Sequence, residues 1–210
     1  MPCRGEDFIE TLMGRRSSKL LRPGYVPREV VIKALEAGVS AANAHNAQPW
    51  RFIVVDDKAV MEELLKEMER LWRRDLVDDG LDVEKVDKIV ENAVGRSRRA
   101  SLLLVACLTM EDMDKYRDSV RNHYEYIMAV QSVAAALQNI LLALHAMGYG
   151  ACWRCSALFA PEAVRKVLGL PEDLIPQALV EVGLKGGETK GVRRPLGEVV
   201  HHNRWGVAYC

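Results

Sequence analysis

The sequence predicts a single domain that combines helices with strands. Its 210 residues are the length of one domain, or of one domain with an elaborated edge. Apolar residues make up 49% of the chain, which is enough to bury a large core. Segments with helical spacing of apolar residues are interspersed with short apolar and β-branched runs, so both kinds of regular structure are expected.

The charge balance argues against several classes of partner. Lys and Arg together number 29, as do Asp and Glu, so no positive excess draws the chain to nucleic acid or to an anionic membrane. No uninterrupted apolar run approaches the roughly 18 residues of a membrane span. The charged N-terminal segment lacks the apolar core of a signal peptide. We therefore expect a cytoplasmic protein that binds neither nucleic acid nor membrane.

The first quarter of the chain is expected to contain two helices and a strand. Apolar residues recur at helical spacing over residues 6–14, which predicts an amphipathic helix. Pro27 fits the start of a second helix, whose apolar face extends to Ala41. Residues 51–55 are β-branched and aromatic, and predict a strand.

The middle of the chain is expected to be mainly helical. Residues 58–74 and 83–94 are amphipathic helices without recognisable chemistry, which suits a cover or a lid. Residues 102–108 are an unbroken apolar run suited to a buried strand. Residues 111–123 are polar and predict a loop. Residues 126–147 form a long helix that is apolar nearly all round, hence buried on most sides, and a candidate for a subunit interface.

The C-terminal part predicts a strand over residues 151–155, a helix over 161–168 and a strand over 178–184. The remaining residues, 185–210, are rich in Gly, with a short strand near Val199. Such a tail can hardly fold on its own, so we expect it to lie on the body or on a partner subunit.

A polar loop lies between the second helix and the first strand. It contains Asn43, His45, Asn46 and Gln48. Side-chain amides offer both donors and acceptors, so this loop can address one planar polar ligand. Asn is also a common turn residue, and a plain turn explains the loop equally well when it is taken alone.

Two basic segments are candidates for binding a phosphate. The first consists of Arg15, Arg16, Ser17, Ser18 and Lys19. Guanidinium, ammonium and hydroxyl groups can hold a phosphate together, although a solvated helix end would carry the same cations. The second segment contains Arg193 and Arg194 in the C-terminal tail.

The cysteines suggest neither a disulfide framework nor a metal site. Their number is odd and their positions are scattered, at residues 3, 107, 152, 155 and 210. Cys152 and Cys155 form a C-x-x-C pair, which is half a zinc site at most. Packed thiols and a redox dithiol are both compatible with it. His201 and His202 are adjacent and cannot share one helix face, so we expect no metal.

Several catalytic templates are absent from the sequence. The dinucleotide fingerprint, the P-loop and the G-x-S-x-G elbow do not occur. No carboxylate pair stands out in an apolar setting. An enzyme with few acid–base residues can lend its scaffold to a cofactor that does the chemistry, so no catalytic side chain is assigned.

Four segments together resemble the FMN-dependent nitroreductase family. They are RRSSK, SAANAHNAQPWRFIVV, ALQNILLALHAMGYGACW and RRPLGEVV, in this order and at suitable spacings. The second and third are the most specific. The resemblance implies an α+β fold whose mostly antiparallel sheet is flanked by helices in three layers. It also implies an interlocked homodimer with two FMN sites at its interface.

The same resemblance implies how the chain is organised. Residues 1–210 would form one nitroreductase-like domain. Residues 58–94 would be a variable helical excursion, and residues 185–210 a C-terminal arm packed on the partner subunit.

The resemblance further implies roles for the basic segments. The family pattern R-x-S-x-R/K falls on Arg15, Ser17 and Lys19, with Arg16 between them. The first Arg and the Ser would hold the phosphate and the ribityl chain. Lys19 would lie near the pyrimidine edge of the flavin and stabilise its anionic reduced form. Arg193, with Arg194, corresponds to the phosphate-binding Arg of the family's tail.

The polar loop matches the family pattern P-S-x-x-N-x-Q-P at Asn46, Gln48 and Pro49. Ala42 and Asn43 replace the usual Pro and Ser, which leaves the role of Asn43 open. His45 stands where several relatives also carry His.

The pattern G-x-G-x-C-W matches residues 148–153. In the family, backbone amides just past it, here about residues 154–156, approach flavin N5. The Cys155 thiol is therefore expected close to the flavin.

The function that the resemblance implies is that of an FMN-dependent NAD(P)H oxidoreductase. NADH or NADPH would reduce the flavin and leave, and a nitroaromatic, a quinone or another small acceptor would take its place in a ping-pong cycle. The acceptor pocket is expected among residues 58–94 and around residues 111–126. Two alternatives stay open: a non-catalytic FMN-binding or storage protein, and a dithiol redox protein that uses Cys152 and Cys155.

Overall fold

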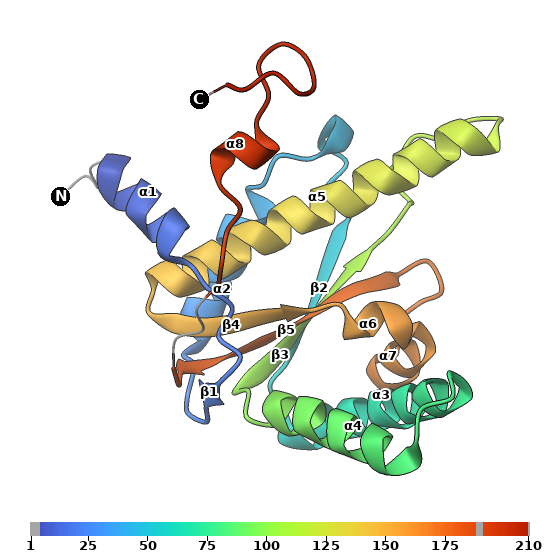
Figure 1. Cartoon of the computed structure of the whole chain (residues 1–210). Helices are drawn as coiled ribbons and strands as arrows, with labels where there is room; N and C mark the ends of the chain where they lie inside the picture. The colour runs from blue at the N-terminus through green and yellow to red at the C-terminus, as the bar shows by residue number, and fades with distance from the viewer. Residues whose placement is uncertain (1–4, 188–190, 210) are drawn as a thin grey trace.

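The computed structural model describes residues 5–187 and 191–209. A five-stranded antiparallel sheet lies between two helical layers (Figure 1). Helices α2 and α5 cover one face, and helices α3, α4, α6 and α7 cover the other (Figure 1). The α+β prediction with an antiparallel sheet and flanking helices is therefore confirmed.

The central strand of the sheet is β5, because its residue Val182 pairs with both Leu102 and Ala151 on its two sides. β2 pairs only with β3, and the short β1 continues beside the end of β5. The strands are β1 (Leu21–Arg22), β2 (Trp50–Val55), β3 (Leu102–Leu108), β4 (Tyr149–Arg154) and β5 (Ile175–Lys185).

Strand β3 is covered on both faces, which explains its unbroken run of apolar residues. Its even-numbered residues pack against α2 (Arg28–Val39) and α5 (Ser119–Ala146), and its odd-numbered residues pack against the opposite layer. Successive side chains of a strand point to opposite faces, so a strand covered on both faces must be apolar throughout.

The second layer contains the two charged helices. These are α3 (Lys58–Asp78) and α4 (Val83–Ser97), which pack on the sheet beside α6 (Ser156–Phe159) and α7 (Pro161–Leu168). Asp57 and Asp82 cap the N-termini of α3 and α4 through side-chain oxygens that accept backbone N–H groups. The two charged helices thus contribute buried residues to the core of this layer.

Two local predictions were wrong. Helix α5 begins at Ser119, within the segment expected to be a loop, because the Asp118 carboxylate accepts the N–H of Arg121 and caps an earlier first turn. The strand expected near Val199 is instead the last residue of the short helix α8 (Leu196–Val199), which follows Pro195.

By length and composition α5 could cross a membrane, with a mean hydropathy of 1.8 over its most apolar window. In the fold it is a core helix. Ala129, Val133, Leu137 and Ile140 are buried in the cluster that it forms with the sheet and α2. On its other face, the side chains of Val120, Tyr124 and Ile127 are exposed.

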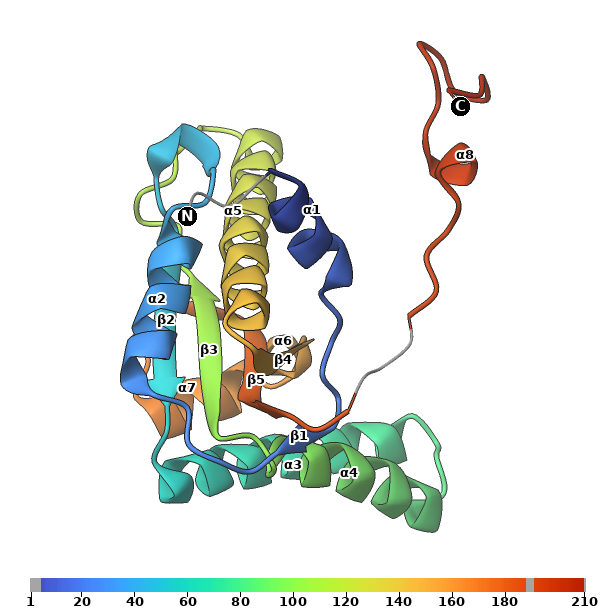
Figure 2. The same ribbon diagram turned by 90° about the vertical axis from the view of Figure 1, so that its left-hand side faces the viewer.

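The two ends of the described chain do not pack into either core. Helix α1 (Gly5–Gly14) buries no residue and exposes Phe8 and Met13. The segment with α8 stands away from the body (Figure 2), and Leu196 is 66% exposed. Apolar side chains left uncovered in this way are typical of a surface that another subunit covers.

Gly38 allows α2 and α5 to approach each other closely, and its replacement is expected to destabilise the fold. A Cβ at this position would lie 2.6 Å from Cγ1 of the buried Ile140. Gly38→Ala should lower the free energy of unfolding by about 1–3 kcal/mol, as overpacking of a core does. Chemical denaturation measures this change.

Gly95→Ala is the matched control, because Gly95 is also helical and no atom lies within 4 Å of its added Cβ. There the change should be neutral or should stabilise the fold by up to about 1 kcal/mol. Equal effects at the two positions would contradict the close packing of α2 on α5.

Candidate functional site

The N-terminal basic segment lies against strand β4. The N–H of Ser18 donates to the carbonyl of Ala151 at 2.9 Å. Gly150 permits this approach, because a Cβ there would lie 3.0 Å from Cβ of Ser18. Ser18 is buried beneath the segment, whereas Lys19 is exposed. The segment is therefore held in place by β4 and keeps cations available at the surface.

The two basic segments, far apart in sequence, come together at the start of β4. A Cβ on Gly191 would lie 3.1 Å from Nη1 of Arg193 and 3.9 Å from Cδ of Arg16. Burial, together with the charges of Arg193 and Arg16, lowers the pKa of Arg15, and no carboxylate is among the groups that shift it. Converging guanidinium groups of this kind are suited to an anion such as a phosphate. Arg194 is exposed.

The charge of Lys19 acts on the Cys152 thiol. Burial raises the pKa of this thiol, and the charges of Arg154 and Lys19 act in the opposite direction. Because the N–H of Ser18 donates to the carbonyl of Ala151, the basic segment lies beside the first half of β4 (Tyr149–Arg154).

The far end of β4 is fixed by a buried carboxylate that the sequence analysis missed. Glu181 is 1% exposed, and its Oε1 lies 3.2 Å from Nε of Arg154 and accepts the hydroxyl of Ser97. A buried charge requires such partners. The one available signal was a Glu within the apolar run of residues 178–184. The interaction holds the chain where it turns from β4 into α6.

A cavity of about 480 Å³ adjoins this turn, between α3, α4 and α6. Its wall is mainly apolar, with Arg154, Cys155 and Ser156 at the end nearest β4. The other lining residues include Leu65, Met68, Trp72, Leu76 and Phe159. Residues 58–94 thus contribute to a cavity, whereas residues 111–126 do not line it.

The polar loop is held in an unusual backbone conformation. His45, Asn46 and Gln48 have φ angles of 54°, 54° and 49°, a region that residues other than Gly rarely adopt. Asn43 stabilises the loop, because its Oδ1 accepts the N–H of Gln48 at 2.8 Å. The N–H of Ala44 donates to Oγ of Ser132 on α5 at 3.1 Å.

The side chains of the loop differ in what they face. The Asn43 carboxamide is engaged within the loop, since its Nδ2 also donates to the carbonyl of Ala41. Asn46 and Gln48 are exposed. The His45 imidazole points to α5, where Nε2 lies 3.5 Å from Oε1 of Glu125.

A single copy of the chain does not bring the polar loop to the basic segments. The loop is anchored to α5 at Ser132, whereas Gly14, just before the basic segment, lies near His145 of the same helix. Thirteen helical residues between these anchors correspond to about 20 Å. Figure 2 shows the loop on one side of α5 and the chain that follows α1 on the other. Residues predicted for one site thus form two groups.

The C-x-x-C cysteines occupy different environments. Cys152 is 3% exposed and its thiol pKa is raised by burial, so it is protonated at neutral pH. Cys155 is exposed at the mouth of the cavity. Both are free thiols, as is the buried Cys107, whereas Cys3 and Cys210 lie outside the described residues. Packing explains Cys152 better than dithiol chemistry does.

Comparison with known proteins gives a consistent picture. The profile of the nitroreductase family matches residues 12–184. An NADH dehydrogenase of Thermus thermophilus is 30% identical over 207 residues, which cover 92% of this chain and 95% of that protein. An Archaeoglobus fulgidus relative, described as an NADH dehydrogenase/NAD(P)H nitroreductase, is 29% identical over 182 residues, 85% of each chain.

Two solved structures extend the comparison to the fold. A BluB-like flavoprotein from Clostridium difficile superposes with a TM-score of 0.78 at 22% identity, covering 93% of this chain and 98% of that one. A nitroreductase from Desulfovibrio desulfuricans, solved in complex with FMN, has a TM-score of 0.70 at 25% identity, with 94% and 97% coverage.

The two cysteines should differ in reactivity. Cys155→Ser should remove one fast-reacting thiol, whereas Cys152→Ser should leave the number of fast thiols unchanged, because only Cys155 is exposed. Ellman's reagent counts these thiols in the native protein, with the denatured protein as the reference for full exposure. Equal loss of fast-reacting thiols in the two variants would show that Cys152 is accessible. It would then favour the alternative of a dithiol redox protein that uses Cys152 and Cys155.

Proposed function

This chain belongs to the nitroreductase family and is a flavin-dependent oxidoreductase, and we propose that it uses FMN to pass reducing equivalents from NADH or NADPH to a small-molecule acceptor. The supporting observation is the arrangement along β4. Converging cations lie at its start, and a largely apolar cavity lies at its end. A mononucleotide that carries phosphate at one end and a ring system at the other fits this arrangement.

The residues present suit FMN. Arg15, Arg16 and Arg193 supply the positive charge that a phosphate dianion needs, and the hydroxyl of Ser17 lies within the same segment. Lys19 follows Ser18, whose N–H is bonded to Ala151 of β4, and from there it can place a positive charge at the edge of the ring system. The FMN complex of the Desulfovibrio desulfuricans relative supports this choice of cofactor.

When bound, FMN supplies the redox chemistry, accepting hydride from the nicotinamide and delivering electrons to the acceptor in a separate half-reaction. The chain's own contribution is positioning and exclusion of water. Arg154, Glu181 and Ser97 fix the end of β4, so the backbone of Cys155 and Ser156 is held at the mouth of the cavity. Trp72 and Phe159 offer flat apolar surface to a nicotinamide, a nitroaromatic or a quinone.

We assign the polar loop to the second subunit's site within a homodimer. Within one chain, the polar loop that carries Asn46 and Gln48 lies on the other side of α5 from the segment that follows α1 (Figure 2). The exposed apolar residues of α1 and of the α8 arm provide surface for a partner. Asn46 of the partner subunit and the partner's Gln48 would then address the polar edge of the flavin. His45, whose imidazole faces Glu125, is left out of this set.

The free cysteines of the described residues suit a reducing compartment, so we place the enzyme in the cytoplasm.

We expect contacts in the cavity to select the physiological acceptor and to decide between NADH and NADPH. Both are open to direct measurement.

Anaerobic titration of the purified protein tests the proposal. The FMN-loaded protein should show a visible flavin band that NADH or NADPH bleaches and that a nitroaromatic or a quinone restores. A protein that cannot be loaded with FMN would refute the proposal. A bound flavin that neither nicotinamide bleaches would instead establish the storage alternative.

The same titration should identify the phosphate site. Arg15→Ala and Arg193→Ala should each weaken FMN binding by about 10- to 100-fold, because each removes charge-assisted hydrogen bonds. Arg70→Ala is the control, since Arg70 is an exposed residue of α3 paired with Glu67. Unchanged affinity in both site variants would remove the phosphate assignment.

Hybrid dimers test whether the loop acts on the partner's site. One subunit carries Arg15→Ala with Arg193→Ala, and the other carries Asn46→Ala with Gln48→Ala. If the loop acts in trans, each hybrid dimer keeps one intact site, and FMN binding should recover to about one tight site per dimer.

Both parent double variants should bind FMN weakly as homodimers. A loop that acts within its own chain would leave no intact site in the hybrid, so no recovery of FMN binding would overturn the trans assignment. Differently tagged subunits, co-expressed and purified through both tags, provide the hybrid for flavin counting by absorbance.

A further inference from the structure

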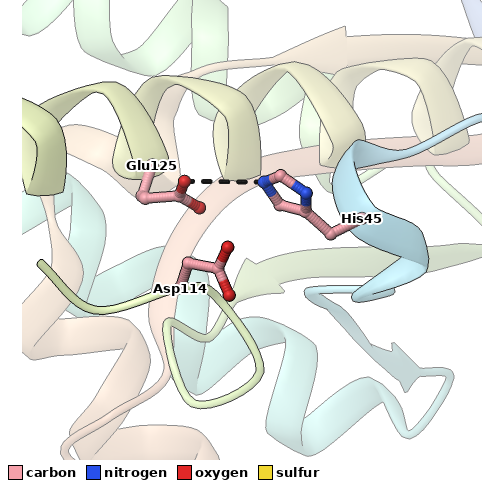
Figure 3. Close-up of side chains that lie close together, drawn as sticks. All are labelled: His45, Asp114 and Glu125. Atoms are coloured by element: carbon pink, nitrogen blue, oxygen red, sulfur yellow. Dashed lines mark ion pairs between the residues drawn. The ribbon is translucent and has the colours of Figure 1, made fainter.

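A cluster of possible metal ligands lies beside the polar loop, and the proposed flavin chemistry does not use it. It consists of His45 from the loop, Asp114 from the segment between β3 and α5, and Glu125 from the second turn of α5 (Figure 3). Their ligand atoms all lie within 4.8 Å of one another. We propose that these residues bind one divalent cation of the first transition row, such as Mn²⁺ or Zn²⁺.

Glu125 provides the main argument. This residue is 2% exposed, and its Oε2 is buried with no hydrogen-bond partner in the part of the chain that the structure describes. Buried carboxylate oxygens are normally paired, because removal of a charge from water is costly. The unmatched oxygen therefore points to a cation.

His45 does not stabilise the buried Glu125 carboxylate through an ordinary hydrogen bond. Its Nε2 lies 3.5 Å from Oε1 of Glu125, longer than a normal hydrogen bond. Two donor atoms bound to one tetrahedral ion at about 2.1 Å lie roughly 3.4 Å apart. The observed separation fits two ligands of one metal ion better than it fits a direct hydrogen bond.

The charge of the cluster also matches a divalent cation. Asp114 and Glu125 carry two negative charges, and neutral imidazole adds none. Across residues 5–187 and 191–209, no Lys or Arg forms an ion pair with either carboxylate. Even a protonated His45 would leave one negative charge unbalanced. A divalent ion neutralises both carboxylates.

The fold presents the three groups from well-anchored segments. Ser132 on α5 holds the loop through the N–H of Ala44, and Glu125 lies two turns earlier on the same face of that helix. Asn122 ties the preceding segment to the start of α5 through two hydrogen bonds with the backbone of Tyr116, at 2.8 and 2.9 Å. Exposure of His45 and Asp114 leaves a path for the ion and room for small adjustments.

The ligand set restricts the class of metal. One imidazole nitrogen with two carboxylate oxygens suits Mn²⁺, Fe²⁺ or Zn²⁺. Mg²⁺ and Ca²⁺ favour oxygen ligands alone, and the absence of thiolate disfavours Cu⁺. A bound ion would tie the polar loop to α5 and to the segment that carries Asp114. The three ligands come from positions 45, 114 and 125, so no local motif could reveal them.

Titration of the full-length protein with Mn²⁺ tests the site, after treatment with a chelator and removal of any affinity tag. The six-line electron paramagnetic resonance signal of free aqueous Mn²⁺ disappears on binding, so the bound ion can be counted. We expect one Mn²⁺ per chain, and Zn²⁺ should displace it.

Substitutions then separate this site from adventitious binding. Glu125→Gln and Asp114→Asn should each weaken Mn²⁺ binding by at least about tenfold. Asp112→Asn should not, because Asp112 pairs with Arg51 outside the cluster. The double substitution His201→Ala with His202→Ala should also leave binding unchanged.

The proposal would be overturned if the chain bound neither Mn²⁺ nor Zn²⁺, or if binding survived both Glu125→Gln and Asp114→Asn. The contact between His45 and Glu125 would then be an ion pair without a metal ion. Asp114 is exposed, so its variant should fold even if Glu125→Gln does not. FMN content, measured in the same samples, distinguishes this outcome from failure of the flavin assignment.

Discussion

The packing of α5 on the sheet is the constraint on which the rest of the structure depends. This helix buries an almost continuous apolar face against β3, β4 and α2, and Gly38 lets α2 approach it closely. The polar loop, Glu125 and the basic segment are then placed by their distances along α5. The polar loop is anchored at Ser132, Glu125 lies two turns before it, and the chain before the basic segment lies beside His145. A rigid helix keeps these groups apart.

The polar loop and the basic segment are held apart in the chain, because their neighbours on α5, Ser132 and His145, are thirteen helical residues or about 20 Å apart. The uncovered apolar side chains of α1 and of the α8 arm are costly in water. The homodimer proposed above would cover those side chains and would bring one protomer's loop to its partner's cations.

Two buried carboxylates, Glu181 and Glu125, differ in the partners that their oxygens have. Glu181 has Arg154 and Ser97 as partners, and with them it fixes the turn where the cavity begins. Glu125 is buried to a similar degree, but one of its oxygens has no hydrogen-bond partner among residues 5–187 and 191–209. The carboxylate at the end of β4 is therefore paired within the fold, whereas the one beside the polar loop is the carboxylate for which we propose a bound cation.

The sequence by itself determined the local elements whose signals are short-range. The apolar run of β3, the helical spacing of the two charged helices and the family's ordered segments can all be recognised from neighbouring residues. Only the tertiary structure decided which segments meet. It brought the charges of Arg15 and Arg193 near each other, anchored the polar loop on α5 away from the basic segment, and brought His45, Asp114 and Glu125 together. Sequence periodicity reports which side of an element is apolar, whereas encounters between distant residues depend on how whole elements pack.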